Sequence, residues 1–111
     1  MRYYHNPRCS KSRQALALLH ERGIEPELVA YLDTPPDACA LRKLLDKLGM
    51  TPRQLLRTGE DAYKAHGLDN PALDDEAIIA AMLESPILIE RPIFETSDQA
   101  VVGRPPERVL D

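Results

Sequence analysis

The first 32 residues alternate between strand-like and helix-like sequence, and this order constrains the fold more than any other feature. RYYH at residues 2–5 is a strand candidate rich in aromatic residues, and ELVAYL at residues 27–32 alternates as a second strand. Between them, SKSRQALALLHER predicts a helix from Ser10 to about Arg22, which Gly23 ends. Two strands joined through a helix normally form a parallel, right-handed β-α-β unit.

The middle of the chain, residues 34–85, is predicted to be an inserted helical segment. Thr34, which precedes two prolines, is typical of a helix N-terminus, and Gly49 is expected to end that helix. The sequence TPRQ then forms a capping box and predicts a short helix that carries Arg57. The signals for the start and end of a further helix are Asp74 and Ser85-Pro86.

The last part of the chain is rich in β-forming residues. ILIERPIFET and AVVG, joined by SDQ, predict an antiparallel hairpin, and RPPERVL predicts a short final helix. The whole layout predicts an α/β fold in which residues 1–33 and 86–111 form a four-stranded mixed sheet with flanking helices. We expect one domain over residues 1–111, with the helical segment 34–85 inserted into it.

Composition excludes several classes of protein. The two cysteines, Cys9 and Cys39, are too few for a disulfide framework, and the three scattered histidines lack the spacing of metal ligands. The net charge of −4 argues against binding to nucleic acid or to a membrane surface. No apolar run approaches the roughly 18 residues of a membrane span, and the N-terminus lacks a signal-peptide apolar region. We therefore expect a cytoplasmic protein with reduced thiols and no metal.

Cys9 is the candidate for chemistry, because it lies where the first strand gives way to the first helix. Unpaired backbone N–H groups and the positive end of a helix dipole are found at such a position. Arg8, Lys11 and Arg13 add positive charge, and all of these features favour the reactive thiolate. His5, four residues upstream, is placed to add a hydrogen bond or a charge. A buried structural cysteine is the alternative, and it fits poorly beside so many polar neighbours.

The residues after Cys9 restrict the reaction. CSKS has the C-x-x-C spacing of thioredoxin-like proteins, but Ser12 replaces the second sulfur, so an internal dithiol exchange at this motif is excluded and a mechanism that uses an outside thiol remains open. A phosphatase loop of the C-x5-R kind is excluded, because the arginine position holds Ala15. Cys39 is a weak candidate for a resolving thiol and is more simply an exposed bystander on its helix.

Five ordered motifs, YHNPRCSKSR, YLDTPP, LLR, PILIERPI and GRPPERVL, resemble the glutaredoxin-coupled arsenate reductase family over essentially the whole chain. HNPRCSKSR with GRPPERVL is especially similar to the short arsenate-reductase-like branch. The resemblance implies a thioredoxin-like fold with a helical insertion. It also implies that the Cys9 thiolate forms an adduct with arsenate, that glutathione resolves the adduct, and that glutaredoxin restores the thiol. No bound cofactor is implied.

The resemblance also assigns residues to roles. His5 and Ser12 take the positions that support the nucleophile, and the oxyanion-binding positions fall on Arg57, Arg91 and Arg104. Guanidinium groups suit this role, because they offset the repulsion between a thiolate and an anion and present a planar fork of donors. Ten of the fourteen basic residues are arginines, although three independent surface ion pairs are the alternative. The thioredoxin-like alignment further predicts a cis bond between Arg91 and Pro92.

Two other functions remain open. The first is a monothiol redox protein of the same fold that acts on glutathione mixed disulfides without efficient arsenate reduction. The second is a binding module like the Spx-type regulators, which bind RNA polymerase and often carry a C-x-x-C switch. Ser12 removes that switch, and three matched arginines exceed what a docking surface needs.

Overall fold

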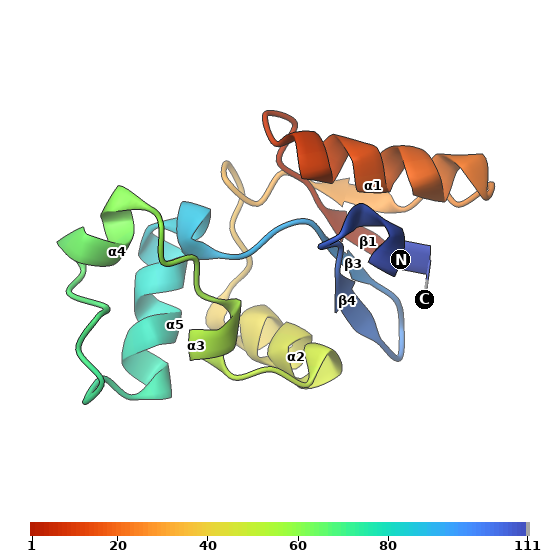
Figure 1. Cartoon of the computed structure of the whole chain (residues 1–111). Helices are drawn as coiled ribbons and strands as arrows, with labels where there is room; N and C mark the ends of the chain where they lie inside the picture. The colour runs from red at the N-terminus through yellow and green to blue at the C-terminus, as the bar shows by residue number, and fades with distance from the viewer. Residues whose placement is uncertain (111) are drawn as a thin grey trace. The chain divides into compact units, whose positions relative to one another are not determined.

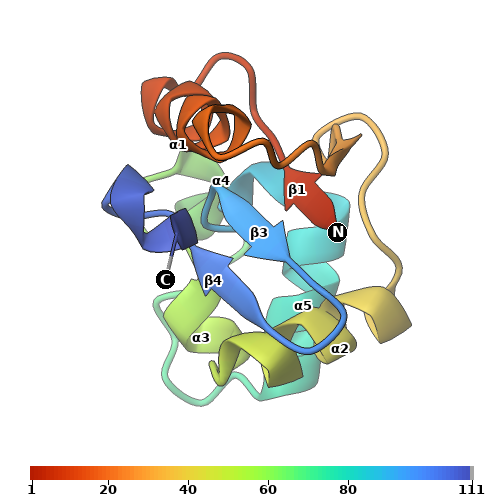
Figure 2. The same ribbon diagram turned by 90° about the vertical axis from the view of Figure 1, so that its right-hand side faces the viewer.

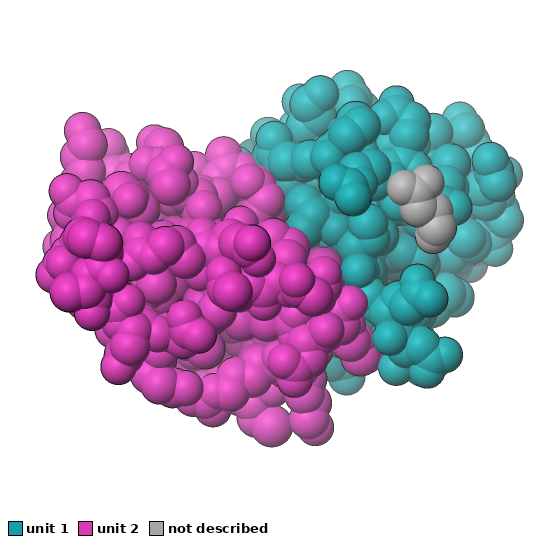
Figure 3. Space-filling model, turned by 60° about the horizontal axis from the view of Figure 1, so that its bottom comes forward, with its two compact units in different colours: residues 1–34, 91–111 teal, residues 35–90 magenta. Residues whose placement is uncertain are grey.

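The computed structural model describes residues 1–110 and divides into two compact units (Figure 3). Unit 1 comprises Met1–Thr34 and Arg91–Asp111, and unit 2 comprises Pro35–Glu90. Each unit is built from its own helices or strands.

Unit 1 holds a four-stranded mixed sheet. Its strands are β1 (Arg2–Tyr4), β2 (Glu27–Val29), β3 (Ile93–Glu95) and β4 (Ala100–Val102). The strand order is β2-β1-β3-β4, with β1 and β2 parallel and the other pairs antiparallel. The parallel first pair and the antiparallel hairpin of β3 and β4 confirm the prediction, whereas no order of the strands was predicted. Figure 2 shows β1, β3 and β4 side by side. β2 is shorter than predicted, because the chain turns after Val29 and the N–H of Thr34 donates to the carbonyl of Ala30.

The helix α1 (Ser10–Glu21) and the 3-10 helix η2 (Pro106–Leu110) pack against each other in unit 1 (Figure 1). Their apolar side chains form one core with Tyr3 of β1 and Phe94 of β3. α1 begins and ends as predicted, and Gly23 takes the left-handed conformation, φ 73°, that a glycine adopts most easily after a helix. The loop before α1 is therefore held between a strand and a helix that both contribute buried side chains to this core.

Unit 2 is helical. Its elements are α2 (Ala38–Leu48), α3 (Pro52–Leu55), α4 (Asp61–Ala65), α5 (Asp75–Glu84) and the 3-10 helix η1 (Pro86–Leu88). α5 lies at the centre and packs against α2, α3 and η1. The predicted capping box at Thr51 and the predicted cap at Asp74 are both confirmed.

Two predicted boundaries in unit 2 are wrong. α2 begins at Ala38 rather than at Thr34, and its cap is Asp37, whose side chain accepts from the N–H of Ala40 at 2.7 Å. Consecutive prolines explain the delay, because a residue that precedes a proline is disfavoured in the helical conformation.

The second wrong boundary is the end of α3, which stops at Leu55. Leu56 forms an isolated antiparallel bridge with Ile89, and the N–H of Arg57 donates to the carbonyl of Leu88 at 2.8 Å. Arg57 is therefore placed by this bridge and not by a helix. In the same region the predicted strand ILIE is replaced by η1 and the bridge.

Among residues 1–110, no helix combines the length and the apolar character needed to cross a membrane.

Candidate active site

Cys9 is the N-cap residue of α1, with the extended backbone conformation φ −93°, ψ 121°. Its N–H donates to the carbonyl of Asn6 at 3.0 Å, and its own carbonyl accepts from the N–H of Arg13 at 3.1 Å. No side chain caps α1, and its first turn contains no acidic residue. The first free N–H groups of the helix are therefore available to the Cys9 sulfur.

The pKa of the Cys9 thiol is lowered from its ordinary value. Burial acts in the opposite direction and would raise the pKa, because it disfavours the charged form. The hydrogen bond from the backbone N–H of Ser12, the guanidinium of Arg91 and the N–H of Lys11 outweigh burial. The balance favours a thiolate on a partly buried sulfur, which is the form of cysteine that attacks electrophiles.

Two arginines from the C-terminal part of unit 1 lie at this sulfur. Nη2 of Arg104 is 3.8 Å from Sγ of Cys9, while its Nε donates to the carbonyl of Arg91 at 2.7 Å. Each arginine precedes a proline across a cis peptide bond. The bond between Arg91 and Pro92 confirms the prediction, and the bond between Arg104 and Pro105 was not predicted.

His5 and Ser12 form a pair beside Cys9. Nδ1 of His5 lies 2.7 Å from Oγ of Ser12, which also accepts from the N–H of Asn6 at 3.1 Å. Ser12 is fully buried, so its hydroxyl is satisfied within the loop. Burial first, and then the charge of Arg13, lower the pKa of His5, which favours the neutral ring.

Arg57 lies in unit 2, and the structure reveals partners for it that the sequence did not. Its Nε donates to Oε1 of Glu60 at 3.2 Å and its Nη1 to Oε1 of Glu90 at 2.9 Å. Unit 1 therefore brings together five of the six predicted site residues, and the sixth is held by two carboxylates in unit 2. Cys39 also lies in unit 2 and is exposed, as predicted.

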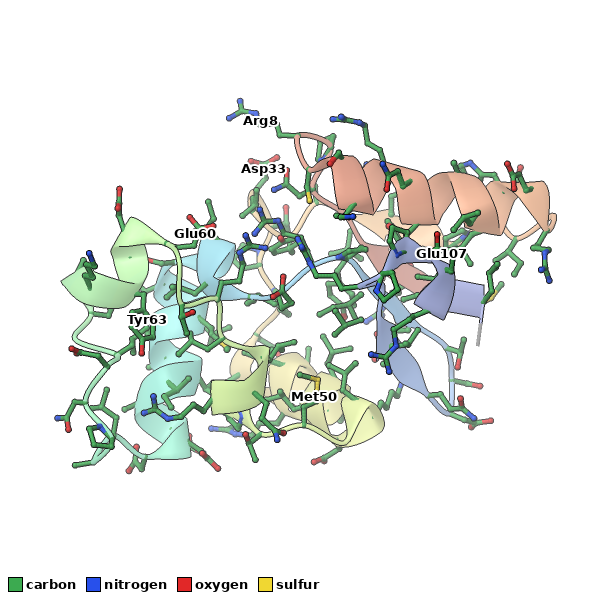
Figure 4. The ribbon with its side chains drawn as sticks, in the orientation of Figure 1. Arg8, Asp33, Met50, Glu60, Tyr63 and Glu107 are labelled. Carbon is green, nitrogen blue, oxygen red and sulfur yellow. The ribbon has the colours of Figure 1, made fainter. Side chains whose placement is uncertain are left out.

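Other side chains around Cys9 are visible only in the structure. The carboxamide oxygen of Asn6 accepts from the N–H of Arg8 at 3.0 Å and shapes the loop. Arg8 itself is exposed and points away from the loop (Figure 4). Tyr3 is fully buried and its hydroxyl donates to the backbone carbonyl of Ser12. The spacing of Tyr3 and His5 in RYYH could have indicated that Tyr3 lies on the same side of the strand as His5, because residues two apart share a strand face.

The sheet and the site define a class of protein. A mixed four-stranded sheet with an activated cysteine between its first strand and first helix is a thioredoxin-like arrangement, and a thiolate beside two guanidinium groups is suited to attack a negatively charged electrophile.

The chain belongs to the ArsC family, whose model matches residues 4–111. An arsenate reductase of Neisseria meningitidis is 51% identical, over 98% of this chain and 94% of that protein. A protein of Escherichia coli described as uncharacterized, YfgD, is 54% identical over 100% of this chain and 94% of its own length. The solved structure of an arsenate reductase from Vibrio cholerae matches with a TM-score of 0.94 and 48% identity, covering 99% of this chain and 96% of the other. These matches confirm the predicted family and fold.

Proposed function

We propose that this protein is an arsenate reductase with Cys9 as its nucleophile. The observation that carries the proposal is the Cys9 sulfur at the uncapped start of α1, with Nη2 of Arg104 at 3.8 Å and the guanidinium of Arg91 lowering its pKa. Relatives that are about half identical and bear the name arsenate reductase support the choice of substrate.

The first step joins the sulfur to arsenic. The Cys9 thiolate attacks arsenate, and one oxygen leaves as hydroxide, which takes a proton from solvent and becomes water. Arsenic stays in the +5 state. Arg91 and Arg104 bind the remaining oxygens and offset the repulsion between thiolate and oxyanion. The family resemblance assigns the third oxyanion-binding role to Arg57. His5 and Ser12 hold the loop and keep the thiolate accessible.

The second step reduces arsenic. Glutathione attacks the Cys9 sulfur as a thiolate, and the electron pair of the sulfur–arsenic bond moves to arsenic, which leaves as arsenite in the +3 state. Two thiols have then become one mixed disulfide between Cys9 and glutathione. A glutaredoxin thiol attacks the glutathione sulfur and releases Cys9 as thiolate. An outside thiol is required because Ser12 stands where a resolving cysteine would be. The cytoplasm, where thiols stay reduced, is the proposed location.

A coupled assay tests the proposal. Arsenate, glutathione, glutaredoxin, glutathione reductase and NADPH are mixed with the protein, and arsenate-dependent NADPH oxidation is followed. We expect saturable turnover in the wild-type protein, none with Cys9→Ser, and full turnover with Cys39→Ser, which is the matched control because it removes the other free cysteine.

The same mixture distinguishes the monothiol alternative. If arsenate causes no oxidation but a glutathione mixed disulfide is reduced through Cys9, the protein is a thiol-disulfide oxidoreductase and the arsenate proposal is wrong. If neither substrate is turned over, capture of RNA polymerase by the purified protein would favour the Spx-like alternative.

A further inference from the structure

Tyr3, at the centre of β1, contacts both His5 and Ser12, the pair described above. Its hydroxyl donates to the backbone carbonyl of Ser12 in the first turn of α1. Its ring lies 5.6 Å from the ring of His5 between centroids, tilted by 41°. The side chain is fully buried, so its position is fixed by the core of unit 1.

Ser12 is the residue through which Tyr3 reaches the thiol. Three of its groups have partners: Oγ contacts His5 and the N–H of Asn6, the carbonyl accepts from Tyr3, and the N–H is directed at the Cys9 sulfur. The direction of that N–H depends on how firmly the hydroxyl and the carbonyl of Ser12 are held by their partners. A backbone N–H has no rotamer freedom of its own, so the aim of the donor is set by the placement of the first turn.

We propose that Tyr3 is a positioning residue for the Cys9 thiolate: its hydroxyl fixes the first turn of α1 so that the N–H of Ser12 points at the sulfur. Burial, the largest cause, raises the pKa of Tyr3 to about 12, with a smaller contribution from the charge of Cys9. The phenol therefore stays a neutral donor wherever Cys9 titrates. The inference shares with the proposed function only the assumption that Cys9 reacts as a thiolate.

The neighbouring residue supplies a matched control. Tyr4 follows on the same strand, is also buried, and has a pKa raised to about 12, again chiefly by burial. Its hydroxyl donates to Oε1 of Glu95 on β3, at 3.1 Å, rather than to α1. Tyr3→Phe and Tyr4→Phe each delete one buried hydroxyl from β1, but only the first removes a contact to the turn that carries Cys9.

The first experiment measures the alkylation rate of Cys9 by iodoacetamide against pH, by mass spectrometry, with Cys39 as the internal reference. Arg91 and Arg104 and the N–H groups of α1 act on this thiol, and both variants keep them. The positive charges of Arg8, Lys11 and Arg13 are likewise unchanged in both variants. We expect Tyr3→Phe to move the Cys9 profile to higher pH and to slow alkylation at pH 6 by about 3- to 10-fold, since one pKa unit changes the thiolate fraction tenfold. Tyr4→Phe should lower the melting temperature and leave the profile unchanged.

The second experiment needs no change at Tyr3, so it holds even if Tyr3→Phe does not fold. In protein labelled with carbon-13 at the phenol carbon of tyrosine, the Tyr3 resonance should shift as Cys9 ionises, the Tyr4 resonance should not, and Cys9→Ser should abolish the shift. The inference is wrong if the alkylation profile of Cys9 is the same in Tyr3→Phe as in the wild type, or if Tyr4→Phe shifts that profile as much as Tyr3→Phe does. It is also wrong if the Tyr3 resonance does not change when Cys9 ionises. Neither experiment uses arsenate, so a failed arsenate assay leaves the inference intact.

Discussion

Both cysteines of this protein lie at the start of a helix, and their surroundings differ. Cys9 is the N-cap of α1, where no side chain caps the free N–H groups and the first turn has no acid. Cys39 lies in the first turn of α2, where the carboxylate of Asp37 accepts from the N–H of Ala40. Arg91 and Arg104 act on Cys9.

The difference shows that a helix N-terminus alone does not make a nucleophile. At α2 one of the free donors, the N–H of Ala40, is used by the carboxylate of Asp37, whose negative charge opposes a thiolate nearby. At α1 the same kind of donors are left for the sulfur, and guanidinium groups reinforce them. Reactivity therefore depends on which group binds the free N–H groups at the start of the helix and on the guanidinium groups nearby. Each of these groups can be changed by substitution.

Removing the guanidinium groups should have the largest effect. Arg91→Ala and Arg104→Ala should each lower kcat/KM for arsenate by roughly 10- to 150-fold, the equivalent of about 1.5–3 kcal/mol for a lost charge-assisted contact. Lysine at either position should rescue poorly, because it restores charge without the bidentate fork. Arg42→Ala is the control on α2, since Arg42 is exposed and pairs with Glu76. Full activity in Arg91→Ala and Arg104→Ala would leave Cys9 a redox thiol without an oxyanion site.

Arg57→Ala should lose turnover to a similar extent and should also destabilise the protein. The guanidinium pairs with Glu60 and Glu90 at side-chain exposures of 22–28%, so its removal leaves two partly buried carboxylates close together. Thermal unfolding beside arsenate kinetics measures both effects. Arg57→Ala,Glu60→Gln,Glu90→Gln should recover stability but not turnover. Recovered turnover would show that Arg57 serves unit 2 alone.

Introducing an acid at the start of α1 should have an intermediate effect. Lys11→Asp places a carboxylate in the first turn of α1. Its negative charge interacts favourably with the helix dipole but disfavours ionisation of the Cys9 thiol. We expect alkylation of Cys9 at pH 6 to slow by about 3- to 10-fold while the melting temperature holds or rises. Lys11→Gln should lie between wild type and Lys11→Asp. If the alkylation rate of Cys9 is unchanged in Lys11→Asp, the charge at the start of α1 does not determine the reactivity of Cys9.

The smallest effect is expected at α2. Asp37→Ala should cost about 1 kcal/mol in the free energy of unfolding, because the N-cap acceptor is lost, and Asp37→Asn should restore most of it. Neither variant places a guanidinium beside Cys39, so its alkylation should change less than threefold. Alkylation of Cys39 at the rate of Cys9 in Asp37→Ala would show that the cap alone separates the two thiols.

The sequence predicted the elements whose signals are local. α1 with Gly23, the Thr51 capping box and the hairpin of β3 and β4 all depend on neighbouring residues, and all were found. The start of α2 was missed, because a favourable cap at Thr34 competes with two prolines that keep the chain extended.

Contacts between residues that are distant along the chain could not be predicted from the sequence. The two carboxylates on Arg57 come together through the bridge between Leu56 and Ile89, which no local pattern encodes. The contact between Tyr3 and Ser12 likewise requires the packing of α1 on β1. Cys9 was predicted from its position before a helix and from its charged neighbours, and the arginines were predicted through the family resemblance, whereas the partners of these residues were accessible only through geometry.

Alkylation of Cys9 and Cys39 in the same sample of wild-type protein, followed by mass spectrometry from pH 5 to 9, tests the central claim most directly. The lowered pKa of Cys9 predicts that it labels faster than Cys39 near pH 6, and that the advantage shrinks as pH rises. Equal rates for the two cysteines at every pH would contradict the account, because the uncapped start of α1 and its guanidinium groups would then confer no reactivity.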